Sequence, residues 1–171
     1  LTGTTDANTS VDVMVGNQTY SAAVTGTGWS LTLDAPKINA IGQGPKAIAV
    51  TSTDLAGNAS TSATLANVVI DTVAPSAATL NALASLSDGF INLTEANAGL
   101  TFSGDKEAGS SVKLVLAGTE LSPTQSTNGT TWTLTLNATE IGKFNQGATS
   151  VALLSTDSAG NTTSSSLSSV T

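Results

Sequence analysis

Hydrophobic and polar residues alternate with a period of two along several short stretches of the chain. In VDVMV (residues 11–15) the valines alternate with Asp and Met, and in WSLTL (residues 29–33) Trp and Leu alternate with Ser and Thr. Such alternation places one set of side chains on each face of a β-strand. Segments rich in Gly, Asn, Ser and Thr separate these runs, as turns separate strands. The pattern predicts an all-β fold, with no more than a helical turn in residues 136–144.

The same pattern occurs twice in the chain. WSLTL returns as WTLTL at residues 132–136, and TDLAGNAS (residues 53–60) returns as TDSAGNTT, both after 103 positions. LTGTTDANTSV, at the start of the chain, aligns with FSGDKEAGSSV at an offset of 101. Matched blocks in one order indicate a tandem repeat of roughly 100 residues, the size of an immunoglobulin-like β-sandwich.

The boundary between the copies falls in a proline-containing segment. Pro75 fixes its own φ, has no N–H to donate, and holds Ala74 in an extended conformation. We therefore expect a first repeat at residues 1–71, a short stiff linker at residues 72–76 and a second repeat at residues 77–171. The first copy then lacks its opening strand, and the chain is expected to be part of a longer polypeptide.

Charge and composition narrow the functional classes. The chain has twelve Asp and Glu residues against five Lys and Arg, and neither His nor Cys. Phosphate recognition usually needs basic patches, so nucleic acids and anionic membrane surfaces are disfavoured as partners. The composition also excludes a zinc site, a thiol nucleophile and a Ser-His-Asp triad. No apolar run is long enough to span a bilayer.

The loops that carry acidic residues are the main candidates for a functional site. In a Greek-key sandwich the loop between the second and third strands and the loop between the last two strands lie at the end where the chain enters. Residues 3–10 and 104–111 match the first of these loops, and the two Asp-x-Ala-Gly-Asn motifs match the second. Converging carboxylates repel one another unless a cation binds them, and Ca²⁺ prefers such oxygen ligands. The predicted calcium ligands at the junction are Asp71, Glu107, Asp157 and Asp105, with Asp6 and Asp54 in the first copy.

A second candidate calcium loop is SDGFINLTEANAG (residues 87–99), between the first two strands of the second copy. Its oxygen-bearing side chains are Asp88, Asn92 and Glu95, but their spacing does not match an EF-hand. An alternative interpretation of all these loops is structural, because Asp and Asn before Gly are common turn formers. The tryptophans also have two interpretations, as core residues in phase with neighbouring leucines or as carbohydrate platforms.

Several of these motifs carry a resemblance to a known family. DTVAP at the linker, the Asp-x-Ala-Gly-Asn loops, SDGFINLTEA, and GWSLTL or TWTLTL resemble the bacterial immunoglobulin-like repeats of giant biofilm-associated and RTX-type surface adhesins. The resemblance implies extender repeats that hold a binding module far from the cell, stiffened by calcium at their junctions. It also implies an extracellular, cell-surface location reached by type I secretion. Neighbouring repeats are then the direct partners, and other domains contact the host or substrate surface.

Two other functions compete with the spacer. A ligand-binding module would recognise a glycan or a host protein through its end loops, although these loops have no aromatic or Arg cluster. A glycosidase needs only two carboxylates, but one of them must be buried in a cleft to raise its pKa. The acids of this chain fall in turns, so the sequence predicts a protein that is not an enzyme.

Overall fold

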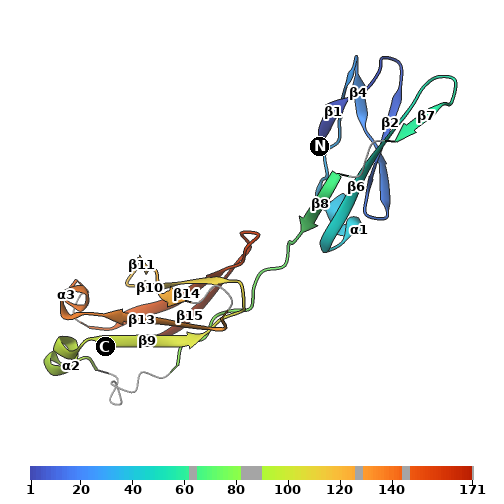
Figure 1. The fold of residues 1–171 in the computed structure, drawn as a ribbon. Helices are drawn as coiled ribbons and strands as arrows, with labels where there is room; N and C mark the ends of the chain where they lie inside the picture. Colours follow the sequence, from blue (N-terminus) through green and yellow to red (C-terminus); the bar gives the residue numbers. More distant parts are fainter. Residues whose placement is uncertain (62–64, 82–89, 126–128, 144–146, 171) are drawn as a thin grey trace. The chain divides into compact units, whose positions relative to one another are not determined.

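The computed structural model describes residues 1–61, 65–81, 90–125, 129–143 and 147–170. The chain divides into two compact units, Leu1–Thr72 and Val73–Thr171 (Figure 1). The division falls one residue after the predicted end of the first repeat. The prediction of an all-β fold is confirmed, because the described residues form antiparallel strands far more often than helices, and these strands form sandwich-like pairs of sheets.

The described residues of the first unit form two sheets. One sheet has the order β1-β5-β4, and the other has the order β3-β2-β6-β7, with β8 also paired to β6. The elements are β1 (Thr2–Thr4), β2 (Ser10–Val15), β3 (Gln18–Ser21), β4 (Ala23–Thr25), β5 (Gly28–Ser30), α1 (Ala35–Ile41), β6 (Gly44–Thr53), β7 (Ala59–Thr61) and β8 (Leu65–Ile70).

The second unit repeats this arrangement. Its sheets have the orders β12-β13-β9 and β11-β10-β14-β15. The elements are α2 (Leu93–Ala98), β9 (Leu100–Asp105), β10 (Ser111–Leu116), β11 (Thr119–Leu121), β12 (Thr124–Gln125), β13 (Thr131–Leu136), α3 (Ala138–Ile141), β14 (Thr149–Thr156) and β15 (Thr162–Val170). A further segment lies antiparallel to β9, since the N–H groups of Thr79 and Asn81 donate to the carbonyls of Asp105 and Ser103.

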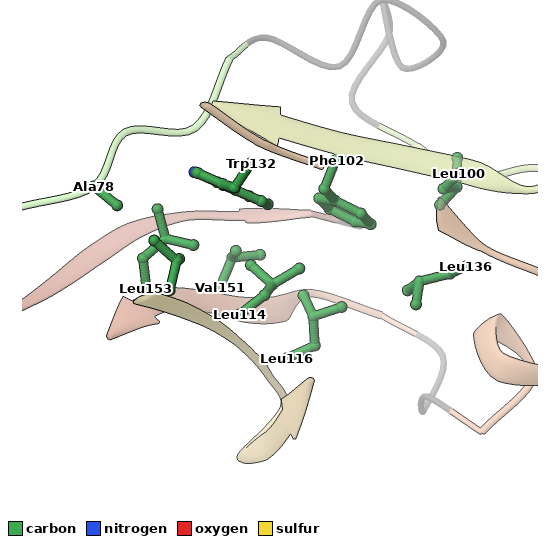
Figure 2. Packing of buried hydrophobic residues seen from close by; sticks show 10 residues of the cluster. Ala78, Leu100, Phe102, Leu114, Leu116, Trp132, Leu136, Val151 and Leu153 are labelled. Carbon is green, nitrogen blue, oxygen red and sulfur yellow. The ribbon is translucent and has the colours of Figure 1, made fainter. Parts of the chain in front are cut away.

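Alternate side chains of the strands form the core of each unit, as the sequence predicts. In β10, Val112, Leu114 and Leu116 are buried. Figure 2 shows Phe102 and Trp132 between the sheets of the second unit, facing the side chains of the opposite sheet. The first unit buries the matching residues Val11, Val13, Val15, Ile48 and Val50.

Of the two interpretations of the tryptophans, the core interpretation holds fully for only one of them. Trp132 is 1% exposed, whereas Trp29 packs against the first core but is only partly buried. The two tryptophans differ in exposure because Thr79 lies beside Trp132. The carbonyl of Thr79 accepts a hydrogen bond from the indole N–H at 3.1 Å. No described residue of the first unit takes that position.

Three short helices interrupt the strands in the described residues, and only α3 falls where the sequence predicts a helical turn. Helix α1 begins after Asp34, whose side chain accepts the N–H of Lys37, and Pro lies in its first turn. These are ordinary start signals for a helix, since Pro needs no N–H there. None of the helices in the described part of the chain is long and apolar enough to cross a membrane.

The core predicts a position-dependent loss of stability. Leu114→Ala removes a fully buried side chain, and we expect it to lower the free energy of unfolding of the second unit by about 2–5 kcal/mol. Leu93 is 79% exposed in the same unit, so Leu93→Ala should change stability by less than about 0.5 kcal/mol. Denaturant unfolding followed by Trp132 fluorescence measures both. Equal losses for the two variants would contradict the described packing.

Candidate calcium-binding loops

The acidic loops of each unit lie at one end of its sandwich. In the second unit Ser111 at the start of β10 pairs with Thr156 at the end of β14, so the loops 106–110 and 157–161 are neighbours. In the first unit Ser10 pairs with Thr53, which brings the loops 5–9 and 54–58 together in the same way. We call this end of each sandwich the entrance end.

The chain enters the second unit at this end. The carbonyl of Pro75 accepts a hydrogen bond from the Thr163 hydroxyl at 2.6 Å, and the N–H of Ser76 donates to Oε2 of Glu107 at 2.8 Å. Pro75 and Ser76, which the sequence assigns to the linker, are therefore bonded to the second unit. Glu107 and the loop of Asp157 lie at the entrance end of that unit, as the Greek-key argument predicts.

The first Asp-x-Ala-Gly-Asn motif closes a loop around its own aspartate. Oδ1 of Asp54 accepts the backbone N–H groups of Ala56 at 2.9 Å and Asn58 at 2.8 Å. Oδ2 accepts the side-chain amide of Asn58 at 2.8 Å. Gly57 has a φ of 90°, which only glycine adopts without strain. The motif is thus a compact turn in which the Asn donates both its backbone N–H and its side-chain amide to the Asp. We call this arrangement the Asn clamp.

The second motif repeats these bonds. Oδ1 of Asp157 accepts the N–H groups of Ala159 at 2.9 Å and Asn161 at 2.8 Å, and Oδ2 accepts the Asn161 amide at 2.8 Å. Gly160 has a φ of 93°. The structural interpretation of the motif therefore describes both copies. A carboxylate offers about four acceptor positions, so the turn uses about three of them.

These hydrogen bonds lower the pKa of both aspartates. For Asp157 the largest cause is the bond from the Asn161 side chain. Desolvation, the next largest cause, raises the pKa, and bonds from the backbone lower it further. For Asp54 the Asn58 side chain is again the largest cause. Bonds that favour the charged form stabilise the carboxylate. Both groups are therefore anionic over the whole neutral and mildly acidic range.

The loop between β9 and β10 has a counterpart in the first unit. The hydroxyl of Thr9 donates to the carbonyl of Asp6 at 2.8 Å, and the hydroxyl of Ser110 donates to the carbonyl of Glu107 at 2.7 Å. The carboxylates of Asp6 and Glu107 are carried by loops that are built alike, so their shared position is a property of the repeat.

A buried lysine distinguishes the second loop from the first. Lys106 is 5% exposed, and its Nζ donates to the carbonyls of Ser110 at 2.8 Å and Glu107 at 3.4 Å. In the first unit the hydroxyl of Thr5 occupies the matching position and contacts the hydroxyl of Thr9 at 2.7 Å. Lys106 was not among the predicted site residues, although a Lys where the other copy has Thr5 was a visible signal.

Two loop positions have different residues in the two copies, and the structure explains why both residues fit at each position. Asn8 and Gly109 occupy matching loop positions, with φ values of 61° and 81°. After Gly, Asn is the residue that adopts this left-handed backbone conformation most readily. Leu55 is 89% exposed, and its counterpart Ser158 is exposed too. Neither difference alters a carboxylate.

The predicted second calcium loop contains a helix. Asn92 is the N-cap of α2, and its Oδ1 accepts the N–H groups of Thr94 at 2.9 Å and Glu95 at 3.1 Å. Oε2 of Glu95 accepts the N–H of Asn92 at 2.9 Å, which completes a capping box. Asp88 lies outside the described residues. The helix was not predicted here, and a calcium role for Asn92 and Glu95 stays a prediction.

The same capping box precedes α3. Asn137 and Glu140 exchange the equivalent bonds at 3.0 and 2.9 Å. The spacing Asn-x-x-Glu in NLTE and NATE was therefore the missed signal for both helices. A capping Asn and a calcium-binding Asn offer the same oxygen, so residue type alone does not separate the two roles.

The remaining predicted ligands lie as follows. Asp105, at the end of β9, is exposed, and its backbone pairs with Thr79. Asp71 is partly exposed and belongs to the first unit. Within the described residues, no three Asp, Glu, His or Cys side chains gather closely enough to hold a metal ion. A calcium site that joins Asp71 to Glu107 and Asp157 stays a prediction.

The recess beside β2 and β6 bears on the glycosidase alternative. It is lined by Gly16, Asn17, Gln18, Ala40, Ile41, Pro45, Lys46 and Ala47. Lys46 is the charged residue of this lining, which contains no carboxylate. The recess therefore lacks the acid pair on which glycoside hydrolysis depends.

No protein-family model and no curated protein matches the sequence. Among solved structures, one from a study of host cell surface retention of a 1.5-MDa bacterial ice-binding adhesin is 23% identical, with a TM-score of 0.49, over 99% of this chain and 55% of the other. The chain spans about half the length of that structure.

Two further solved structures are similar at a comparable level. A tetra-tandem repeat from the extending region of a large adhesion protein is 21% identical, with a TM-score of 0.41, over 96% of this chain and 43% of the other. Fibronectin(III)-like modules of Clostridium thermocellum CbhA are 15% identical, with a TM-score of 0.48, over 96% and 77%. These similarities are too remote to assign a function.

The clamp on Asp157 predicts a titration effect. Asn161→Ala removes the largest cause of the lowered pKa, so the pKa of Asp157 should rise towards its usual value of 3.8. A lowered pKa contributes stability that is present above the unfolded-state pKa and lost as pH falls through the folded-state pKa. The variant should therefore lose stability at neutral pH, and the difference should shrink in strong acid.

Carboxyl-detected NMR titration and denaturant unfolding at several pH values measure this effect. Ser158→Ala changes an exposed side chain of the same loop and serves as the control. An unchanged pKa of Asp157 in Asn161→Ala would show that the clamp does not set its ionisation.

The capping box of α2 gives a separate prediction. Asn92→Ala should lower the free energy of unfolding of the second unit by about 1 kcal/mol in EDTA, because two N–H groups lose their acceptor. Thr94→Ala is the control. Thr94 is exposed and donates its backbone N–H to Asn92, so the substitution keeps this hydrogen bond. The same unfolding in millimolar Ca²⁺ tests the ligand role: an equal loss indicates a cap only, and a larger loss indicates a ligand.

Proposed function

We propose that this chain is a pair of spacer repeats from a bacterial surface adhesin, extracellular and without enzymatic activity. Calcium at the junction of the repeats stiffens the pair. The observation that carries the proposal is the entrance end of each sandwich, where two loops with acidic residues are neighbours in both copies. A protein that gains reach by repetition needs each repeat to present the same joining surface to the one before it.

The connection between the units is short, which supports a spacer. The side chain of Gln43 holds Thr72 by two hydrogen bonds, of 2.7 Å to its hydroxyl and 2.9 Å from its N–H. Further along the chain, the carbonyl of Pro75 accepts a hydrogen bond from the Thr163 hydroxyl of the second unit. Only Val73 and Ala74 lie between these anchored ends, so the connection has few rotatable bonds.

The acidic residues near this connection supply oxygens that suit calcium. Glu107 uses Oε2 to hold Ser76, and Asp157 uses about three of its four acceptor positions within its own loop. The other oxygen positions of these carboxylates, together with Asp71, form the proposed ligand set. Asp105 is a further candidate, and Asp6 with Asp54 would serve the corresponding junction of the first repeat.

Calcium would act on this system by mass action. An ion that binds the folded, aligned pair but not the unfolded chain stabilises the former. Extracellular modules function with weak sites, with dissociation constants of roughly 10⁻⁴–10⁻³ M. The proposed adhesin therefore becomes stiff in a calcium-rich medium. Biofilm formation and type I secretion are the biological setting that the family resemblance suggests.

Glu107→Gln is the sharpest test of the ligand set. The Gln oxygen can still accept the Ser76 N–H, so the fold of the loop is retained while the anionic ligand is lost. We expect the calcium affinity of the full chain, measured by isothermal titration calorimetry, to fall by about tenfold or more.

Glu120→Gln is the matched control, because Glu120 is exposed on β11, where it pairs with Lys113. It lowers the net negative charge by the same amount away from the entrance end, so its calcium affinity should equal that of the parent. Equal affinities for the parent and both variants would contradict the proposed ligand set. Absence of any calcium binding at millimolar concentration would reject the calcium part of the proposal.

A further inference from the structure

The recess beside β2 and β6 lies at the end of the first sandwich opposite its entrance end. Its walls are the turn between β2 and β3, the end of α1 and the start of β6. The recess has a volume of about 380 Å³, which is within the range of small-molecule pockets. All of its lining residues lie between positions 16 and 47, so the recess belongs to the first unit by itself.

Two hydrogen bonds and a core residue hold these walls in place. The N–H of Gly16 donates to the carbonyl of Ala47 at 2.9 Å, which joins the turn to β6. The hydroxyl of Tyr20 donates to the carbonyl of Lys37 at 3.3 Å, which joins β3 to α1. Ile41, the last residue of α1, is buried in the core of the unit. The recess is therefore formed before a ligand arrives, and binding requires little reorganisation.

Lys46 supplies the charge of the lining. It lies on the same face of β6 as the buried residues Ile48 and Val50, because alternate residues of a strand share a face. A Cβ on Gly16 would lie 3.1 Å from Cδ of Lys46, so the aliphatic stem of the lysine crosses the turn. Lysines often pack their stems in this way and leave the charged end free. The Lys46 ammonium makes no ion pair or hydrogen bond with any described residue.

Two side-chain amides share the lining with this ammonium. Asn17 and Gln18 are exposed, and neither of their amides is hydrogen-bonded to another described residue. Each amide offers a carbonyl acceptor and an NH₂ donor, a combination that suits hydroxyl groups. An ammonium forms its strongest hydrogen bonds with an anion. The lining therefore presents one site for a negative charge and two for hydroxyls.

The chemistry of the lining discriminates between classes of ligand. The recess has no aromatic side chain on which a neutral sugar ring could stack, and no arginine fork for a phosphate. One ammonium balances one negative charge, and the C-terminal end of α1 adds a partial negative charge that disfavours a dianion. A monoanion with several hydroxyls matches these groups best.

We propose that the recess binds one acidic sugar unit, a uronate. Its carboxylate pairs with the ammonium of Lys46, and its hydroxyls bind the amides of Asn17 and Gln18. A uronate carries one carboxylate and several hydroxyls, which is the combination that the lining presents. This inference concerns a ligand site of the first unit, and it depends neither on calcium nor on the spacer function.

The second unit provides an internal comparison. By the repeat alignment, Lys46 corresponds to Thr149, Asn17 to Gly118 and Gln18 to Thr119. The matching positions therefore carry neither an ammonium nor an amide, although the strands around them are the same. The proposed site belongs to one copy and is distinct from the entrance end that the two copies share.

Titration of the full chain with galacturonate, followed by ¹H–¹⁵N NMR in metal-free buffer, tests the proposal. The metal-free buffer prevents a cation from bridging the sugar to the acidic loops. Lys46→Met keeps the stem that crosses the turn and removes only the ammonium. Lys143→Met is the matched control, because Lys143 is exposed in the second unit and has no ion pair with a described residue.

The other probes separate the parts of the ligand. Galactose has the hydroxyls without the carboxylate, acetate has the carboxylate without the hydroxyls, and inorganic phosphate is an anion of different charge and shape. Trigalacturonate distinguishes the two sources of the sugar unit: tighter binding than galacturonate would identify a polysaccharide, and weaker binding would identify a free sugar. Gln18→Thr introduces the residue of the second unit and tests the amide.

We expect saturable shifts of the N–H signals of residues 16–18, 46 and 47 at millimolar galacturonate, and unchanged signals at residues 117–119 and 149. Lys46→Met should weaken binding by about tenfold or more, Gln18→Thr should weaken it less, and Lys143→Met should bind as the parent does. The proposal is overturned if the signals of the recess do not shift, or if Lys46→Met binds as tightly as the parent. Binding of galactose, acetate or phosphate as tight as that of galacturonate would overturn it as well.

Discussion

Burial of alternate side chains between two sheets is the constraint on which both units depend. The chain has no cysteine for a disulfide and few charged residues, so its stability rests on this apolar layer. A one-residue shift of β10 against β14 would turn Val112, Leu114 and Leu116 towards solvent. The register of this pair of strands is therefore strongly specified. A fixed register in turn fixes which loops meet at the entrance end, and that placement is the basis of the functional proposal.

The entrance end combines a structural and a proposed ionic role in the same residues. The Asn clamp keeps Asp157 ionised and holds its carboxylate in one orientation. Glu107 anchors the incoming chain through Ser76. A ligand that is already positioned loses little conformational entropy on binding, so a turn built around a carboxylate is a suitable starting point for a weak calcium site. The buried ammonium of Lys106 lies in the same loop and offsets part of the negative charge when no ion is bound.

The sequence predicted the repeated strands and the meeting of the acidic loops, because period-two burial and chain reversal are consequences of residue order. It did not predict that Asn92 and Glu95 cap a helix, since their oxygens suit a capping box and a calcium loop equally well. The different environments of Trp29 and Trp132 were also hidden, because both lie in the same local pattern. What differs is the segment around Thr79, which is distant in sequence from the tryptophan it covers.

Small-angle X-ray scattering of the full chain, in millimolar Ca²⁺ and in excess EDTA, tests the central claim of a calcium-stiffened spacer most directly. The account predicts that calcium lengthens and narrows the distribution of interatomic distances in the parent, and that Glu107→Gln keeps the broad distribution in both conditions. Superimposable profiles of the parent with and without calcium would contradict it, and the acidic loops would then be turns that hold the entrance end together without an ion.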